Sequence, residues 1–306
     1  MSDGLSRRWS PGRPVDLFRT LAPLRRGTGD PTFRMDEAGA IWRAARTPNG
    51  PGTLRISAAP AAGEVLGQAW GPGAAWLLEQ LPALCGAADD PDNFQPAHPI
   101  LREAVARYPG FRLTRAGQLI DVLVPCVLEQ KTTGRQARAS YRELMRRYGA
   151  PAPGPVAGRA LLVPPDPATW ALVPSWAWHR AGVEPARSRA IVTAMKHAGR
   201  LEGTLTMGSS VADQRLRALP GIGVWTSAEI RQRSFGDPDA VSVGDFHLPA
   251  TVGWALAGER VDDAGMLELL APYAGHRYRV TALIELCAGP APRRAPRLTI
   301  QNHRSH

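Results

Sequence analysis

The feature that most constrains the fold is a short turn, Leu219, Pro220, Gly221, Ile222 and Gly223, between two segments of helical pattern. Pro220 ends the first helix, because proline has no backbone N–H and disfavours a helical conformation in the residue before it. The glycines let the chain turn through positive φ and leave backbone N–H groups bare. A second helix begins at once, so its positive end favours a phosphate oxygen. The sequence predicts either a plain structural turn or a two-helix unit that holds a nucleic-acid backbone.

A carboxylate, Asp245, follows this turn in the loop Val243–His247. Aspartate is a preferred helix N-cap, and a helix is predicted to begin at His247, so capping is the alternative to a chemical role, and both can hold. The turn and the carboxylate together resemble the helix-hairpin-helix base-excision DNA glycosylases. The string PGIG-x-W-T, followed by GDPDA and a GD pair, is most similar to their 3-methyladenine DNA glycosylase II branch.

The resemblance implies a monofunctional DNA glycosylase of base excision repair, which flips alkylated bases, N-methylated purines above all, out of the duplex. Asp245 would stabilise the positive charge that develops on the sugar as the N-glycosidic bond breaks, and an abasic site would remain. Relatives that also nick the backbone use a lysine amine at the place that Trp225 holds here. The alternative from another class is a non-catalytic DNA-binding protein that recognises lesions or DNA shape on the same scaffold.

The resemblance also assigns further site residues. Trp225 is expected to stack on the flipped base, the alternative being a core tryptophan between the two helices. Gln130 is expected to approach the DNA or the base pocket, or else to be a polar residue at a helix end. The sequence departs from the family at two pocket positions. Glu229 stands where an aromatic pocket residue is found and would favour a cationic base or else face solvent. The C-terminal helix lacks the family's pocket tryptophan, and Phe246 is a candidate substitute in the pocket. The residues expected to contact the DNA backbone are Leu219, Pro220, Gly221, Ile222, Gly223, Thr226 and Arg187.

The composition favours a polyanionic partner. The chain of 306 residues carries a formal net charge of +10 and has a pI near 10.4. Only Lys131 and Lys196 among its 37 basic residues are lysines, so part of this charge reflects the codon usage of a GC-rich genome. The cysteines Cys85, Cys126 and Cys287 are far apart and form no Cys/His cluster. Their spacing predicts no zinc site, iron–sulfur cluster or disulfide framework.

The sequence carries no signal-peptide pattern and no apolar run of membrane-spanning length. A cytoplasmic, nucleoid-associated protein without a membrane partner is therefore expected. We expect no cofactor and no metal ion held by side chains, whereas the resemblance adds a monovalent cation at backbone carbonyls of the hairpin. The expected partner is double-stranded DNA that contains damaged bases. No obligate protein partner is expected, and the resemblance implies a monomer.

The pattern along the chain predicts an α+β fold in four parts. Residues 1–14 form a flexible arm, and residues 15–95 form a small β-rich domain with helices. Residues 96–290 form a mostly α-helical glycosylase domain, and residues 291–306 form a basic tail. Alternating β-formers bounded by turn residues predict the strands Thr32–Met35, Ala40–Arg46, Thr53–Ser57 and Glu64–Trp70.

From residue 100 onward the pattern is nearly all helical, with short connections. Segment 118–131 is apolar on most sides, as a central buried helix would be. The predicted helices are 100–108, 118–131, 135–148, 167–173, 175–181, 186–199, 211–219, 224–235, 247–256, 263–270 and 276–287.

Overall fold

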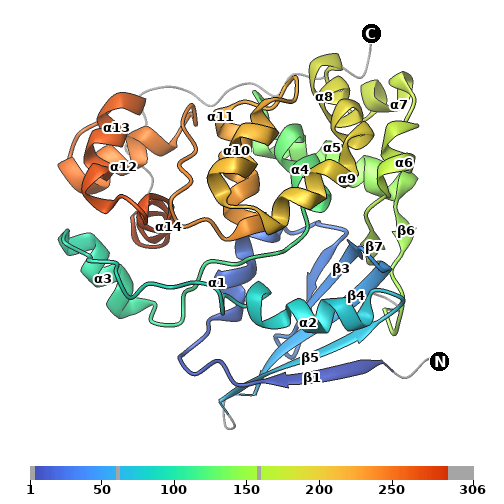
Figure 1. Ribbon diagram of the computed structural model, residues 1–306, viewed down its shortest axis with the longest axis horizontal. Helices are drawn as coiled ribbons and strands as arrows, with labels where there is room; N and C mark the ends of the chain where they lie inside the picture. The colour runs from blue at the N-terminus through green and yellow to red at the C-terminus, as the bar shows by residue number, and fades with distance from the viewer. Residues whose placement is uncertain (1–3, 60–62, 157–159, 289–306) are drawn as a thin grey trace.

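The computed structural model describes residues 4–59, 63–156 and 160–288. A small antiparallel sheet formed by the N-terminal part of the chain lies beside a larger helical body (Figure 1). The predicted α+β fold is confirmed. The predicted basic tail, residues 291–306, lies outside the described residues. Within these described ranges no helix is long and apolar enough to cross a membrane.

The sheet has five strands, and every neighbouring pair is antiparallel. The strands are β1 (Leu5–Trp9), β2 (Phe33–Met35), β3 (Ile41–Thr47), β4 (Gly50–Ala59) and β5 (Glu64–Trp70), in the spatial order β1-β5-β4-β3-β2. Successive side chains of a strand point to opposite faces. Ile41 and Ala45 accordingly belong to the main core, whereas Trp42 and Ala44 belong to a smaller cluster on the other face, where Trp42 stacks on Trp70. The alternation on which the strand predictions rest therefore has a direct cause in packing.

Helices form most of the remaining described chain, together with a short two-stranded sheet. The elements are α1 (Leu17–Leu21), η1 (Ala22–Leu24), α2 (Ala74–Leu84), α3 (Pro99–Arg107), α4 (Ile120–Leu128), α5 (Gly134–Tyr148), β6 (Ala150–Pro151), β7 (Leu162–Val163), α6 (Pro167–Ala171), α7 (Ser175–Arg180), α8 (Pro185–Lys196), α9 (Ala198–Glu202), η3 (Gly203–Thr206), α10 (Ser209–Arg217), α11 (Val224–Ile230), the π-helix η4 (Arg231–Phe235), α12 (Leu248–Ala257), α13 (Asp263–Leu270), η5 (Ala271–Tyr273) and α14 (Arg277–Cys287).

The predicted flexible arm at residues 1–14 is wrong in its central part, because this part is strand β1. β1 pairs along its whole length with the edge of β5. Arg7 donates to the Leu78 carbonyl of α2 at 2.9 Å, and Trp9 packs against the main core. These partners lie far along the chain, so the local sequence does not reveal them.

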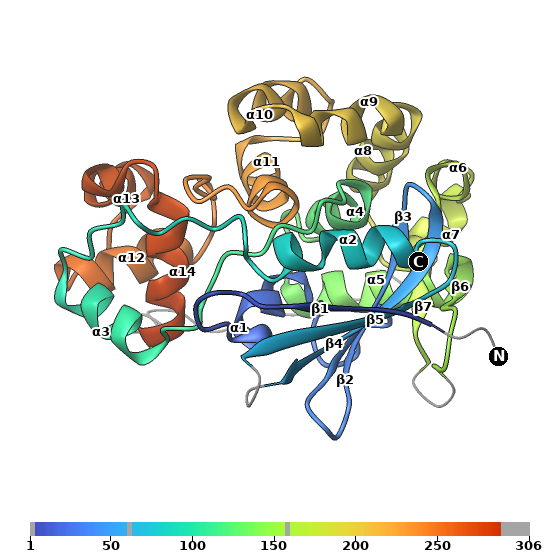
Figure 2. The same cartoon turned by 60° about the horizontal axis from the view of Figure 1, so that its bottom comes forward.

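The helices form two groups, each with its own core. The main core joins the sheet to α2, α4, α5 and α8. A second core joins α3 to α12, α13 and α14, and Figures 1 and 2 show α3 beside these C-terminal helices. A buried ion pair between Arg279 of α14 and Asp89 ties the C-terminal helices to the segment ahead of α3. The loop from η4 to α12 therefore crosses from one group to the other.

Helix α4 is the central helix of the first group, as its apolar sequence predicts. All of its residues except Asp121 are buried. The helix ends at Leu128, earlier than the predicted segment 118–131, and Lys131 has a left-handed backbone with φ of 48°. Such a φ is uncommon for a residue with a side chain, so the chain turns sharply here before α5 begins.

Candidate functional site

In the hairpin turn, one buried side chain lies between two residues whose backbone is exposed. Ile222 is 3% exposed and fixes the turn to the main core, whereas Gly221 and Gly223 lie at the surface. Gly221 has φ of 87°, and a Cβ there would lie 2.6 Å from the Cβ of Ala190. Both facts require glycine at this position. Gly223 is the N-cap of α11 and has no side chain to satisfy the first N–H groups of the helix, so these groups are available to an anion.

Gln130 holds the hairpin from within. Its side-chain amide donates to the Gly221 carbonyl and to the Thr226 hydroxyl, each at 2.8 Å. Thr226 is 2% exposed, so it cannot present its hydroxyl to a DNA phosphate in this conformation. The structure thus corrects the prediction of direct DNA contact for Thr226, and it places Gln130 beneath the turn.

Arg187, predicted to contact DNA, is also corrected. It is 6% exposed, and its guanidinium donates to the Leu128 carbonyl at 2.9 Å. The C-terminus of a helix is its negative end, so a buried cation there stabilises α4. A buried side chain with this partner does not reach a phosphate, whereas Arg189, two residues further along α8, is exposed.

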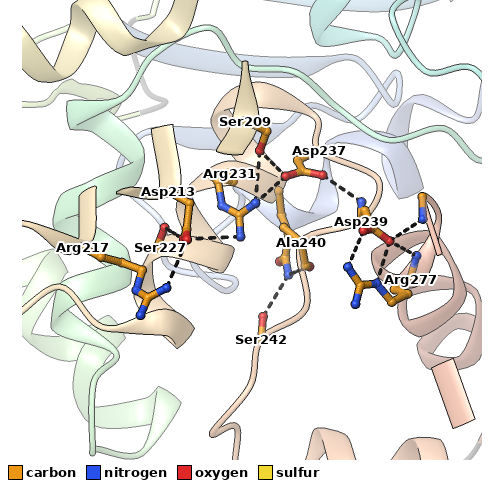
Figure 3. A network of polar contacts seen from close by, with 12 residues as sticks. Ser209, Asp213, Arg217, Ser227, Arg231, Asp237, Asp239, Ala240, Ser242 and Arg277 are labelled. Carbon is orange, nitrogen blue, oxygen red and sulfur yellow. Dashed lines mark hydrogen bonds and ion pairs between the residues drawn. The ribbon is translucent and has the colours of Figure 1, made fainter. Parts of the chain in front are cut away.

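Hydrogen bonds and ion pairs that we call the hairpin clamp join α10 to α11, to η4 and to the loop after η4 (Figure 3). Arg231 lies at its centre and pairs with Asp237 at 2.7 Å and with Asp213 at 3.6 Å. Asp213 of α10 also accepts from the Ser227 hydroxyl of α11 at 2.7 Å. The clamp is formed by Ser209, Asp213, Ser227, Arg231 and Asp237.

The loop after η4 is fixed at several further points (Figure 3). The Asp239 carboxylate accepts from Arg277 of α14 in a bidentate pair. The Gln232 side chain donates to the Ala240 carbonyl at 2.8 Å and to the Ser242 hydroxyl at 2.9 Å. Asp237 and Asp239 therefore shape the loop, in agreement with the turn-forming string GDPD. These contacts determine where the next carboxylate, Asp245, is held.

Asp245 lies between the hairpin and α12. One carboxylate oxygen accepts from the indole N–H of Trp225 at 3.1 Å. The other accepts from the backbone N–H groups of His247 and Leu248, at 2.8 and 2.9 Å. Asp245 thus accepts N–H groups at the start of α12, but the N-cap residue of this helix is His247 and not, as the sequence had suggested, Asp245. Over the described ranges no cation lies within ion-pair distance of this carboxylate, unlike those of Asp237 and Asp239.

No protein-family model matches the chain. A curated relative, the probable bifunctional transcriptional activator/DNA repair enzyme AlkA of Mycobacterium tuberculosis, is 31% identical over 156 residues. The match covers 50% of this chain and 30% of the relative, so the chain spans less than a third of the length of the curated relatives it matches.

Solved structures extend this likeness to nearly the whole chain. A 3-methyladenine DNA glycosylase from Archaeoglobus fulgidus superposes with a TM-score of 0.77 at 14% identity, over 91% of this chain and 97% of that one. The chain has the fold of the helix-hairpin-helix DNA glycosylases. The 8-oxoguanine glycosylase/lyase of Clostridium acetobutylicum, in complex with double-stranded DNA, gives a TM-score of 0.70 at 10% identity, over 93% and 94% of the two chains. The resemblance stated from the hairpin and Asp245 is confirmed at the level of the fold.

In this glycosylase fold, the side chains around Asp245 come from α11, η4 and α14. Glu229 forms an ion pair with Arg233 at 2.7 Å and accepts from the Ser242 hydroxyl at 2.6 Å. Burial lowers the pKa of Arg233, but the combined attraction of Glu229, Cys126, Tyr278 and Glu129 outweighs burial and leaves the pKa raised. The negative charge of Glu229 is therefore balanced by Arg233, so Glu229 attracts a cationic base less than its sequence position suggests.

Glu285 of α14 is another acidic group whose charge interacts with that of Asp245. Burial, Glu229 and Asp245 together raise its pKa to about 7 against the opposing charge of Arg233, although its side chain is still exposed to solvent. Tyr278, two helical turns earlier, has a pKa raised by burial, and the charges of Glu229 and Arg233 act on it too.

Phe246, predicted to line the pocket, points outward. It is 80% exposed and packs edge-on against His247, with 4.9 Å between the ring centroids. Val224, at the start of α11, is 40% exposed. Trp225, in contrast, is only partly exposed and contacts Asp245. The structure thus brings Trp225 and Asp245 together and leaves Phe246 on the surface beside them.

Sequence reasoning missed the roles of Arg231 and Arg233. For Arg231 and Arg233 the signal was weak, because their partners belong to other elements or lie on a helix predicted without its π turn.

Proposed function

We propose that this protein is a DNA glycosylase of base excision repair that excises alkylated purines. The contact between Trp225 and Asp245 carries the proposal, because it holds a carboxylate without a cation beside an aromatic ring at the start of the hairpin helix. A protein that only binds DNA gains nothing from such a group, since a carboxylate repels phosphates. The fold shared with DNA glycosylases supports the same activity.

The hairpin would hold the DNA backbone beside the lesion. The exposed backbone of Gly221 and Gly223 and the first N–H groups of α11 can donate to phosphate oxygens without reading the sequence. Gln130 supports this surface from below, so the turn is held in one conformation before DNA binds. The remaining turn residues shape the surface, with Pro220 exposed and Ile222 buried.

In the proposed reaction, the bond between C1′ and the base nitrogen breaks and its electron pair leaves with the base. Positive charge develops on the sugar, and Asp245 stabilises it. Water adds to C1′, and its proton goes to the Asp245 carboxylate or to solvent. Three N–H donors, one from Trp225 and two from the start of α12, keep this carboxylate in place. Little reorganisation is then needed during the reaction.

We propose that the enzyme is monofunctional. A strand-nicking glycosylase needs a lysine amine that forms a Schiff base with the sugar. The only lysines are Lys131 and Lys196, at the turn after α4 and at the end of α8. In the resemblance, the place of the catalytic lysine corresponds to Trp225. The product would therefore be an intact abasic site, which breaks only in alkali.

N-methylated purines are the proposed substrates because such bases carry positive charge. A cationic base stacked on the Trp225 indole gains about 0.5–2 kcal/mol from the cation–π interaction. Glu229 adds less than its sequence position suggests, because Arg233 neutralises it. Solved structures with this fold include glycosylases for 3-methyladenine and for 8-oxoguanine. The identity of the excised lesion is therefore a more specific proposal than the glycosylase activity.

The remaining expectations belong to the same proposal. The partner would be duplex DNA with damaged bases, bound by a monomer in the cytoplasm at the nucleoid. A monovalent cation could be held only by turn carbonyls, since the described residues contain no group of three His, Cys, Asp or Glu side chains suited to a metal. The Gly221 carbonyl already accepts from Gln130, which leaves one lone pair for such an ion.

The test is base release from methylated duplex DNA by the native protein and by Asp245→Asn. The asparagine side-chain oxygen can still accept from the His247 and Leu248 N–H groups, so the variant should keep its fold. We expect release to fall by about 100-fold or more, the magnitude typical for loss of electrostatic stabilisation. The exposed Asp92→Asn is the matched control and should release base at the native rate. Strand breaks should appear only after alkali.

Equal release by native protein and Asp245→Asn would overturn the assignment of Asp245. Breaks without alkali would overturn the monofunctional proposal. Tight binding to DNA without release from any damaged substrate would favour the alternative, a non-catalytic protein that recognises lesions or DNA shape. Binding that does not weaken as salt is added would argue against phosphate contacts at the hairpin altogether.

A further inference from the structure

We propose that a row of arginines on α5 and on the segment from η1 to β2 binds the backbone of the same DNA duplex that the hairpin holds. This surface, which we call the basic strip, is formed by Arg25, Arg34, Arg135, Arg138 and Arg142. The inference rests on the DNA binding in the proposed function and extends it. It gives the N-terminal part of the chain a share in holding DNA.

The three arginines of α5 lie on one face of the helix. Arg135, Arg138 and Arg142 are spaced three and four residues apart, which places side chains above one another on a helix surface. Arg135 and Arg138 are exposed, and Arg142 is partly exposed. From Arg135 to Arg142 the helix rises by about 10 Å. This length corresponds to about three base pairs of duplex DNA.

The segment from η1 to β2 lies against this face of α5. A Cβ at Gly27 would lie 2.8 Å from the Cδ atom of Arg138, and a Cβ at Gly29 would lie 3.1 Å from the Cδ atom of Arg142. The two arginine side chains therefore lie directly across this segment, where glycine leaves room for them. Two parts of the chain that are about a hundred residues apart thus form one surface.

Arg25 and Arg34 add two further charges to this surface. Arg25 donates to the Gly27 carbonyl at 3.2 Å, and Arg34 donates to the Thr28 carbonyl at 3.4 Å. A neutral carbonyl directs a guanidinium without cancelling its charge. Both arginines are partly exposed. The basic strip therefore joins two cations of the N-terminal part to three of α5.

Within the described residues no member of the basic strip forms an ion pair with a carboxylate, in contrast to arginines beside it. Arg146, one turn further along α5, is paired with Glu143 at 3.3 Å. Asp30, the carboxylate of the same segment, is buried and accepts from the N–H groups of Arg26 and Thr32. The positive charge of the strip is therefore unbalanced. Such a surface attracts a polyanion, which relieves the repulsion among its cations.

The basic strip is continuous with the hairpin, which favours duplex DNA over any other polyanion. Gln130 donates to the Gly221 carbonyl of the turn at 2.8 Å. The exposed Lys131 follows, and Arg135 is the second residue of α5. Five residues of chain separate Gln130 from Arg135, so the strip begins within about 18 Å of the hairpin. This distance corresponds to about five base pairs, so a duplex held at the hairpin is long enough to reach the strip.

The test is the salt dependence of binding to undamaged duplex DNA, with native protein compared to Arg138→Gln/Arg142→Gln. Each phosphate contact adds about 0.9 to the slope of log affinity against log salt concentration. We expect the slope to be smaller by about 1.8 in the variant. The advantage of the native protein should therefore shrink by about tenfold between 50 and 200 mM salt. Arg25→Gln/Arg34→Gln should also lower the slope, because the N-terminal part takes a share in binding.

Two further variants separate phosphate contact from other causes. Arg8→Gln/Arg102→Gln removes two exposed arginines from β1 and α3 and changes the net charge equally, so it is the matched control and should keep the native slope. Arg138→Lys/Arg142→Lys keeps both charges and should also keep the slope, whereas a change in packing against Gly27 and Gly29 would affect it as well.

A native slope in Arg138→Gln/Arg142→Gln, or an equal loss in the Arg8/Arg102 control, would overturn the inference. A loss of slope in the lysine variant as large as in the glutamine variant would also overturn it. The expected slopes together with no base release from any damaged duplex would reject the proposed glycosylase and leave the basic strip supported. Native affinity that does not respond to salt would reject both the hairpin contact and the strip.

Discussion

The carboxylates of the hairpin clamp and Asp245 lie close in sequence and differ in their partners. In the clamp, Asp213 and Asp237 are both paired with Arg231. Asp245, one loop further along, has no cation within ion-pair distance in the part of the chain that the structure describes. The clamp carboxylates are neutralised, whereas Asp245 retains its capacity to act on a substrate.

This difference separates two roles that the sequence does not distinguish. A buried carboxylate paired with arginine contributes to the geometry of the loop, and loss of its partner leaves an uncompensated charge. A carboxylate that accepts only N–H groups keeps its charge for a cation that develops during a reaction. Changes in the clamp should therefore affect folding first, and changes at Asp245 should affect chemistry first.

The largest effect on stability is expected for Arg231→Met. Removal of this guanidinium leaves Asp237, whose side chain is 8% exposed, with no cation, and it opens the contact to Asp213. Breaking a buried pair in this way costs about 3–5 kcal/mol. Urea unfolding should show that loss. Arg217→Met, which removes an exposed partner of the same Asp213, is the control and should cost less than about 1 kcal/mol.

Equal losses in these two arginine variants would contradict the comparison, because they would show that burial of the clamp contributes nothing. A loss of base release in Arg231→Met without a loss of stability would also contradict the structural role of the clamp. The clamp would then act in the chemistry rather than in the fold.

A smaller loss is expected for Gly221→Ala in the turn that the clamp supports. Alanine would adopt φ of 87° and place its Cβ 2.6 Å from that of Ala190. The left-handed conformation alone costs about 1–2 kcal/mol. Unfolding should show a loss of about 2 kcal/mol, and affinity for duplex DNA should fall because the turn is displaced.

Gly223→Ala tests the effect of a side chain on the exposed turn surface without backbone strain. Its Cβ would meet nothing within 4 Å and its φ is −92°, so the cost in unfolding should stay below about 1 kcal/mol. A larger loss of stability in Gly223→Ala than in Gly221→Ala would contradict the assigned conformation of the turn.

Sequence reasoning recovered those parts of the molecule whose cause is local. The turn at residues 219–223 is determined by proline and glycine chemistry, and four of the five strands follow from alternation. Helix α13 begins at Asp263 and ends at Leu270, as predicted, because Asp262 accepts from the Gly265 N–H as an N-cap. In each case neighbours along the chain supply the relevant partners.

The predictions that failed depend on partners distant in sequence. β1 forms because the edge of β5 is available, and nothing within residues 1–14 shows this. Arg187 is basic and lies near a helix start, yet the Leu128 carbonyl lies within its reach in the folded chain. Glu229 is paired with Arg233 in the folded chain, so its charge is balanced although its sequence position suggested a free carboxylate near the pocket.

Asp121 provides the last and smallest test, because it has a raised pKa outside the site. Burial raises its pKa to about 6 from an ordinary value of 3.8, although it accepts from the Arg46 N–H at 2.9 Å and lies near Arg43. Between these two pH values the folded state binds more protons than the unfolded state. Stability due to this group is therefore present below about pH 4 and declines as pH rises through 6.

The free energy of unfolding of native protein relative to Asp121→Asn should accordingly fall by about 1–3 kcal/mol between pH 4 and pH 7. Urea unfolding at several pH values measures it, and base release should follow stability alone. A direct effect of Asp121→Asn on the chemical step at constant stability would show that a raised pKa is not enough to separate structural carboxyl groups from catalytic ones. If Asp245→Asn alone lowers release at constant stability, then position beside the hairpin, rather than burial, is what makes a carboxyl group part of the site.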